Sequence, residues 1–169
     1  MNKEINTSEI FNQALQKIKE NNIKTATELF KKILEIDPNH LQSNFYLGNI
    51  YAQTKNFTEA IKIFNKIINN NPESAEAYNN LGLINLELTN TDEAKKYFEK
   101  AIDIKPSFSD PYNNLGLMFM KLGNINNSKK YYEKSVEVNP DNFQAMNNLG
   151  VLSKNYGKST DAEKYFKNT

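Results

Sequence analysis

Apolar residues along the chain recur at the intervals of amphipathic helices and do not alternate as they would in strands. One set occupies positions i, i+4, i+7 and i+8 of a single helical face: Ala26, Phe30, Ile33 and Leu34. A set with the same spacing returns 68 residues later: Ala94, Phe98, Ala101 and Ile102. The pattern predicts an all-α protein.

The helical pattern repeats with a period of 34 residues. Glycine keeps this interval at Gly48, Gly82, Gly116 and Gly150. Proline keeps it at Pro38, Pro72, Pro106 and Pro140. Two residue types that recur with the same period of about 34 residues indicate an array of helical hairpins. Because proline disfavours helical backbone in the residue before it, each second helix should end just before its proline.

On this frame we expect a short lead, 1–6, and then one repeat array, 7–169. Its units are 7–40, 41–74, 75–108, 109–142 and a truncated fifth, 143–169. Left-handed turns are expected between the two helices of a unit, at Asn21, Lys55, Thr89, Gly123 and Gly157, with β-branched Thr89 fitting poorly. Side-chain oxygens three residues later should cap the second helices, at Thr58, Asp92, Asn126 and Thr160.

Glycine in the middle of each first helix costs about 1 kcal/mol of helix propensity relative to alanine. Its recurrence therefore implies a close contact between helices. We expect the partner to be the small residue of the second helix: Ala60, Ala94, Ser128 or Ala162. Aromatic residues at 64, 98, 132 and 166 would then fill the space between hairpins, and Ser128 in place of alanine predicts looser packing in the fourth unit.

These motifs resemble the tetratricopeptide repeat family. Its pattern has Leu-Gly and an aromatic in the first helix, Ala and an aromatic in the second, and Pro at the boundary. In the third unit the matching residues are Leu81, Gly82, Ala94, Phe98 and Pro106. The first unit departs from the pattern, with Gln13-Ala14 in place of Leu-Gly. The resemblance covers nearly the whole chain and implies a right-handed solenoid of antiparallel helix pairs, with four full repeats and a truncated fifth.

The resemblance also implies that the first helices line a concave groove. Successive repeats would present there Asn12, Tyr46, Asn80, Asn114 and Asn148; beside them lie Phe11, Phe45, Asn79, Asn113 and Asn147, with Leu83 and Leu117 one turn on. A ladder of amides can pair with the backbone of an extended peptide, and its side chains should point away from the helix core. The Asn-Asn-Leu-Gly motif is similar to the repeats of O-linked N-acetylglucosamine transferases. The alternative is that these amides only solvate one helix face.

Composition excludes several classes of function. The formal net charge is +1 and all 21 basic residues are Lys, so nothing favours nucleic acid or an anionic membrane as partner. The chain has no Cys and a single histidine, His40, expected to be a solvated loop residue. We therefore expect no catalytic site, no metal and no cofactor. No apolar run approaches the ~20 residues of a membrane span, and the N-terminus lacks a signal-peptide core. Both favour a cytoplasmic protein.

We expect a scaffold that binds an extended peptide or partner segment along the groove. A clamp for charged chaperone tails would need converging basic residues, whereas the groove carries Glu76, Glu87 and Asp110. Two alternatives stay open. The chain stops at Thr169 before any capping helix, so it could be the substrate-recruiting arm of a larger glycosyltransferase or sulfotransferase. It could also self-associate through that uncapped end.

Overall fold

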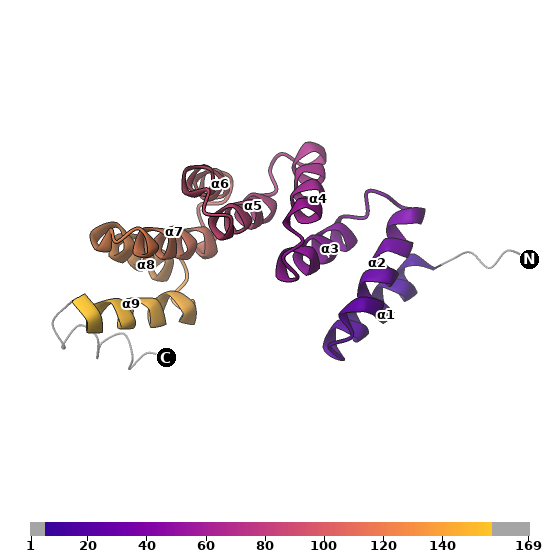
Figure 1. The fold of residues 1–169 in the computed structure, drawn as a ribbon, viewed down its shortest axis with the longest axis horizontal. Coiled ribbons are helices and arrows are strands. Elements are labelled where there is room, and N and C mark those ends of the chain that lie inside the picture. The colour runs from indigo at the N-terminus through magenta and orange to yellow at the C-terminus, as the bar shows by residue number, and fades with distance from the viewer. Residues whose placement is uncertain (1–5, 157–169) are drawn as a thin grey trace, which may run out of the picture. The chain divides into compact units, whose positions relative to one another are not determined.

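The computed structural model describes residues 6–156, which fold into nine α-helices without strands. The helices are α1 (Thr7–Lys19), α2 (Ile23–Ile36), α3 (Leu41–Gln53), α4 (Phe57–Asn70), α5 (Ala75–Glu87), α6 (Thr91–Ile104), α7 (Ser109–Lys121), α8 (Ile125–Val138) and α9 (Phe143–Tyr156) (Figure 1). The all-α prediction is confirmed.

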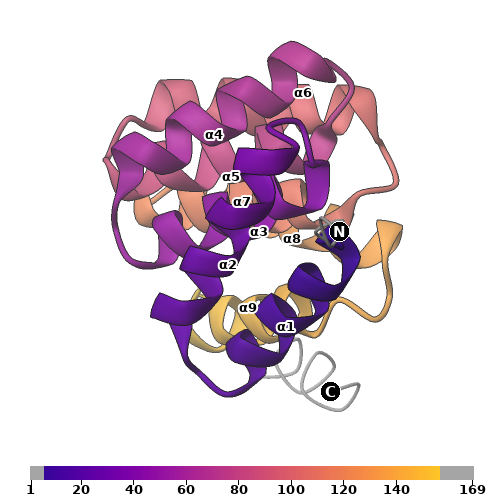
Figure 2. The same ribbon diagram turned by 90° about the vertical axis from the view of Figure 1, so that its right-hand side faces the viewer.

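The chain divides into two compact units, 1–72 and 73–169. In the first unit, α1 pairs with α2 and α3 with α4, and α2 also packs on α3. In the second unit, α5 pairs with α6 and α7 with α8, while α9 packs on α8. There α7 also contacts both α5 and α9, so the first helices of three successive repeats form one layer (Figures 1 and 2).

Proline ends the second helix of each repeat, as the sequence predicts. The helices stop at Ile36, Asn70, Ile104 and Val138, and the next residue, just before the proline, has left helical geometry. The left-handed turn between paired helices is confirmed at four positions: Asn21 (φ 55°), Lys55 (φ 60°), Thr89 (φ 63°) and Gly123 (φ 71°). Gly157 lies outside the described residues.

The predicted caps of the second helices are wrong by two residues. The N-caps are Asn22, Asn56, Asn90 and Asn124, whereas Thr58, Asp92 and Asn126 are the second residues of α4, α6 and α8. The reason is the turn itself. The backbone N–H of Asn22 donates to Lys17 O at 2.8 Å, the 6→1 bond of a Schellman motif. The residue that closes one helix therefore also begins the next, because its Oδ1 accepts from Thr25 N at 3.2 Å. The predicted cap Thr160 lies outside the described residues.

The glycine of each first helix packs against an aromatic ring of its own hairpin, which corrects the expectation of a small partner. A Cβ added at Gly82 would lie 2.5 Å from Phe98 Cε1, and one at Gly116 would lie 2.5 Å from Tyr132 Cδ1. At Gly48 the nearest atom is the tip of Phe64, at 2.9 Å. The aromatic residue therefore fills the hairpin and glycine makes room for it. Gly150 is buried in α9, and Ala162 and residue 166 lie outside the described residues.

The predicted small residues of the second helices are nevertheless fully buried. Ala60, Ala94 and Ser128 each have 0% exposure. The expectation of looser packing at Ser128 is not supported by its contacts, because its hydroxyl donates to Gly116 O at 2.9 Å. The hydroxyl satisfies its hydrogen-bonding requirement inside the hairpin, so the polar substitution leaves no unpaired buried group.

His40 is not a solvated loop residue. It is half-buried and caps α3, where its Nδ1 accepts from Ser43 N at 3.2 Å, and its ring lies 5.5 Å from that of Phe11. Across the described part of the chain, no helix has both the length and the apolarity to cross a membrane.

Candidate functional site

Two asparagine pairs connect the first helices of successive repeats in the second unit. Asn114 Nδ2 of α7 donates to Asn79 Oδ1 of α5 at 2.8 Å. Asn148 Nδ2 of α9 donates to Asn113 Oδ1 of α7 at 3.0 Å. We call these two pairs the amide rungs. They join residues that the sequence analysis placed side by side on the same face.

Each rung joins residue i to residue i+35 and not to the residue at the same repeat position. With a repeat of 34 residues, residue 114 corresponds to residue 80, which is the neighbour of residue 79. Each rung is therefore offset by one residue from equivalent positions. A rung uses one amide nitrogen and one amide oxygen. The rung itself uses neither the Nδ2 group of its first asparagine nor the second lone pair of each oxygen.

The amide side chains are more buried than the sequence analysis expected. Asn79 and Asn113 are each 6% exposed and Asn114 is 8% exposed, so they do not simply point away from the helix core. Asn148 is half-buried and Asn147 is exposed. Asn80 is half-buried and takes part in an interaction of its own. The rungs therefore tie successive repeats together, and of their four asparagines Asn148 is the most exposed.

Leu83 and Leu117 are half-buried on the same helices as the rungs. Both pack against the core cluster formed by Leu86, Ala94, Phe98, Leu115 and Met118. Both leucines therefore help to cover this cluster. Their contribution to a binding surface stays a prediction.

In the first unit the same position is aromatic. Phe11 and Tyr46 are also 35 residues apart, and their rings meet edge to face at 5.8 Å. Tyr46 further stacks on Phe30, with ring centroids 5.3 Å apart and planes 8° apart. Tyr46 remains 37% exposed and Asn12 is exposed. Two predicted groove residues of the first unit, Phe11 and Tyr46, thus form an aromatic contact where the second unit has an amide rung.

Two of the acidic residues on the first helices of the second unit, Glu76 and Glu87, are paired with lysine. Glu76 and Lys105 lie 3.0 Å apart, and Glu87 and Lys121 lie 3.7 Å apart. Partial burial opposes ionisation of Glu76, but hydrogen bonds from its own backbone and from Lys105 outweigh it and lower the pKa of this carboxyl. Because Lys105 and Lys121 are each paired with a glutamate, these two lysines do not form a basic cluster that could bind an acidic ligand.

A second polar network, which the sequence analysis missed, lies where α7, α8 and α9 meet. Ser135 Oγ donates to Ser109 O at 2.9 Å, and Asn142 Nδ2 bonds to both serine hydroxyls at 3.2 and 3.1 Å. Asn142 Oδ1 also accepts from Ala145 N at 3.1 Å. The signal in the sequence was Ser135 at a position that is Ile33, Ile67 or Ala101 in other repeats. The network is buried and internally satisfied, so its role is structural.

Within residues 6–156, no group of three or more His, Asp or Glu side chains is arranged to hold a metal ion. His40 is committed to capping α3. The described residues therefore offer hydrogen-bonding and packing surfaces, and the amide rungs are the candidate site.

Four models described as tetratricopeptide repeat match the sequence, over residues 17–82, 75–108, 109–142 and 131–164. The chain belongs to the tetratricopeptide repeat family. The search of curated proteins gave no match.

Solved structures show the same fold. MamA is 28% identical, with 92% of this chain and 91% of MamA covered and a TM-score of 0.71. PilW, a widely conserved type IV pilus biogenesis factor, is 24% identical over 96% of this chain and 75% of its own, with a TM-score of 0.80. A thermophilic TPR protein of Thermus thermophilus is 14% identical over 96% and 89%, with a TM-score of 0.81. Family and fold support a protein-interaction scaffold.

Proposed function

We propose that this chain binds an extended peptide segment of a partner protein along the first helices of its second unit. The observation that supports it is the pair of amide rungs, Asn79–Asn114 and Asn113–Asn148. The donors and acceptors that the rungs themselves do not use would match the backbone groups that every extended peptide carries. Recognition of this kind tolerates many ligand sequences, because it reads backbone amides.

The spacing of the repeats suits such a ligand. Packed helices lie about 8–10 Å apart, and an extended chain advances about 3.3 Å per residue. Each repeat therefore corresponds to about three ligand residues. Two rungs on α5, α7 and α9 would engage a segment of about six residues. Because the rungs carry no charge, affinity should vary little with salt.

The first test replaces the asparagines by side chains that still fill the space of the amides. Asn79→Phe with Asn114→Tyr copies into the second unit the aromatic pair that the chain itself uses at Phe11 and Tyr46. A simpler variant, Asn114→Ala with Asn148→Ala, removes one member of each rung. The binding of a peptide library to these proteins and to the wild type is measured by fluorescence anisotropy.

Each lost amide hydrogen bond should cost about 0.5–1.5 kcal/mol of binding free energy. The double alanine variant should therefore bind roughly five- to a hundred-and-fifty-fold more weakly, at about tenfold per 1.4 kcal/mol. Because the rungs also connect repeats, both variants are first checked by thermal melting, and binding is measured well below the melting temperature.

The control changes four lysines of α6 and α8 to Gln: Lys95, Lys96, Lys129 and Lys130. Three of them pair with a glutamate of their own helix, at 3.5 Å (Lys95–Glu99), 2.5 Å (Lys96–Glu93) and 3.8 Å (Lys129–Glu133). This variant should keep full affinity. If it loses binding while the folded asparagine variants keep theirs, the amide rungs only connect repeats and the proposal is wrong.

A further inference from the structure

The start of α3 is capped by the single histidine of the chain, His40. Its ring nitrogen Nδ1 accepts from Ser43 N at 3.2 Å and lies 2.9 Å from Ser43 Oγ. His40 is half-buried, and Ser43 is fully buried. Because Nδ1 accepts the backbone N–H, the neutral ring must carry its proton on Nε2. The cap therefore depends on the charge state of the ring.

Asparagine performs the same task at equivalent positions of other repeats. Asn6 stands 34 residues before His40, and its Oδ1 accepts from Glu9 N at 3.3 Å. Asn142 stands 102 residues after His40, and its Oδ1 accepts from Ala145 N at 3.1 Å. An amide does not titrate, whereas histidine changes its charge between about pH 5 and 8. Of these three caps, that of α3 alone can respond to pH in this range.

Protonation of His40 opposes the start of α3 in two ways. With a proton on Nδ1 the ring can donate to Ser43 Oγ, but it can no longer accept from Ser43 N, so this backbone donor loses its partner. The positive charge also lies beside the positive end of the helix dipole, where a cation is unfavourable. Attraction between the imidazolium and the Phe11 ring acts in the other direction, and it is smaller than the two losses together.

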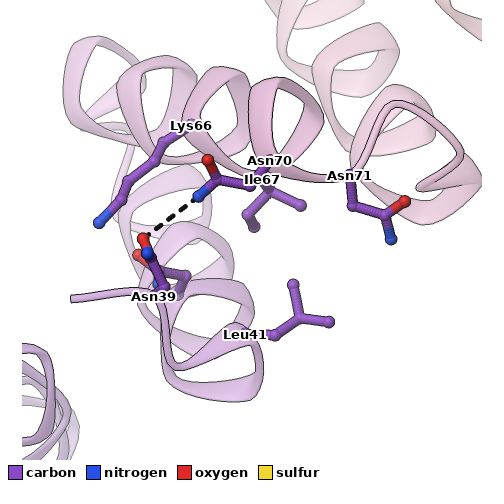
Figure 3. A pocket seen from close by; sticks show the side chains of 7 residues that line it. Asn39, Leu41, Lys66, Ile67, Asn70 and Asn71 are labelled. Carbon is purple, nitrogen blue, oxygen red and sulfur yellow. Dashed lines mark hydrogen bonds between the residues drawn. The ribbon is translucent and has the colours of Figure 1, made fainter. Parts of the chain in front are cut away.

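The two residues before His40 are held on α4 by contacts that do not involve the imidazole. Asn70 Nδ2 donates to Asn39 Oδ1 at 3.2 Å (Figure 3). Lys66 Nζ donates to Pro38 O. These contacts should survive protonation of the ring, so a change caused by acid should be confined to the first turn of α3 and to its contact with α1.

The charged groups around His40 come from the preceding turn and from α4, and they have opposite signs. His40 N donates to Asp37 O at 3.1 Å, and the carboxylate of Asp37 accepts from Asn39 N at 3.0 Å. Lys66 lies on the α4 side of the same turn. From α1 the uncharged ring of Phe11 faces the imidazole, and α3 itself carries no charged side chain. The response to acid therefore depends on the cap and the helix dipole.

We propose that His40 is a pH-sensitive cap, which holds the first turn of α3 at neutral pH and releases it in acid. The contact with α1 would loosen as well, because the rings of His40 and Phe11 lie 5.5 Å apart and Phe11 also meets Tyr46 of α3. Phe11 and Tyr46 belong to the predicted groove, so acid would alter this surface of the first unit. The amide rungs lie in the second unit, and the proposal does not depend on them.

The test compares thermal melts of the wild type, His40→Asn and His40→Ala at about pH 8 and pH 5. His40→Asn installs the cap that the chain itself uses at Asn6 and Asn142, without a group that titrates in this range. The cap requires the neutral ring, so its stabilisation is present at the higher pH and lost as the pH falls. We expect His40→Asn to match the wild type at the higher pH and to melt roughly 2–4 °C above it at the lower pH, the effect of one helix cap.

His40→Ala lacks a cap at both pH values. It should melt below the wild type at the higher pH, and this difference should shrink at the lower pH. Because His40 is the single histidine, other groups that titrate are the same in all three proteins and cancel in the comparison.

NMR of the ¹⁵N,¹³C-labelled full chain locates the effect. At the higher pH, the ring nitrogens of wild-type His40 should show Nε2 protonated and Nδ1 without a proton. As the pH falls, the Ser43 amide and the rings of Phe11 and Tyr46 should shift together in the wild type and stay unchanged in His40→Asn. The proposal is overturned if His40→Asn keeps the pH response of the wild type, if the wild type shows none at Ser43, or if Nδ1 carries the proton at the higher pH.

Discussion

The close contact between Gly116 and Tyr132 predicts that Gly116→Ala destabilises the protein, although alanine is the better helix former. A Cβ at this position would lie 2.5 Å from Tyr132 Cδ1 and 2.6 Å from Cε1. Carbon atoms in contact prefer about 3.5–4.0 Å. The ring must therefore move by about 1 Å, and it is only 1% exposed.

The magnitude follows from two opposed terms. Alanine gains about 1 kcal/mol over glycine in helix propensity, whereas inserting an atom into a packed site costs about 1–3 kcal/mol. We expect a net loss of about 1–2 kcal/mol for Gly116→Ala and likewise for Gly82→Ala. At Gly48 the nearest atom is farther, at 2.9 Å, so Gly48→Ala should be nearly neutral. The chain itself has the fully buried Ala14 at this position in the first repeat.

Thermal and urea melts of the three alanine variants measure this ranking. A loss of about 1 kcal/mol lowers the melting temperature by roughly 2–4 °C at this chain length. The double variant Gly116→Ala, Tyr132→Leu should lose less stability than the sum of its single changes, because the smaller side chain relieves the contact. Equal stabilities for Gly116→Ala and Gly48→Ala, or strictly additive losses, would refute the reasoning.

Three further predictions concern turns, buried polar groups and pH. Thr89→Gly should raise the free energy of unfolding by about 1 kcal/mol, since a β-branched residue at φ 63° is strained, and Gly123→Ala at φ 71° should lower it by about as much; thermal melts of both decide. Ser135→Ala should cost about 1–2 kcal/mol in urea titrations, because Asn142 and Ser109 lose a hydrogen-bond partner; a neutral result would contradict this. Burial raises the pKa of the Tyr132 hydroxyl. Its contribution to stability is present below the unfolded pKa of about 10 and is lost as pH rises through the folded value. In an alkaline absorbance titration, Tyr132→Phe should therefore remove one phenol that ionises at a pH above the ordinary tyrosine pKa of about 10.

Features fixed by local chemistry could be predicted from the sequence. Proline at Pro38, Pro72 and Pro106 ends the preceding helix through sterics of one peptide unit, and the structure agrees. The left-handed turns were also predicted, even at Thr89, because the period of the repeat places that residue in the turn whatever its own preference. The resemblance to the tetratricopeptide repeat family rested on the same phased motifs.

The predictions that were wrong concern positions where one residue belongs to two helices' ends, or where side chains of two helices pack into the same space. The caps were misplaced because the Schellman motif makes Asn22 close one helix and start the next. The residue that contacts each glycine was misassigned. The spacing of residues predicts which face of a helix a residue lies on, but it does not show which side chain of the neighbouring helix is long enough to reach that residue. Phe98 is long enough to reach Gly82, and Ala94 is not the nearest side chain.

The sequence by itself determined that this protein is a set of helical hairpins with a period of 34, and it placed the asparagines on one face of the first helices. Only the tertiary structure decided what those asparagines bond to. Asn79 pairs with Asn114, and Asn113 with Asn148, because packing brings adjacent repeat positions of neighbouring helices within hydrogen-bond distance.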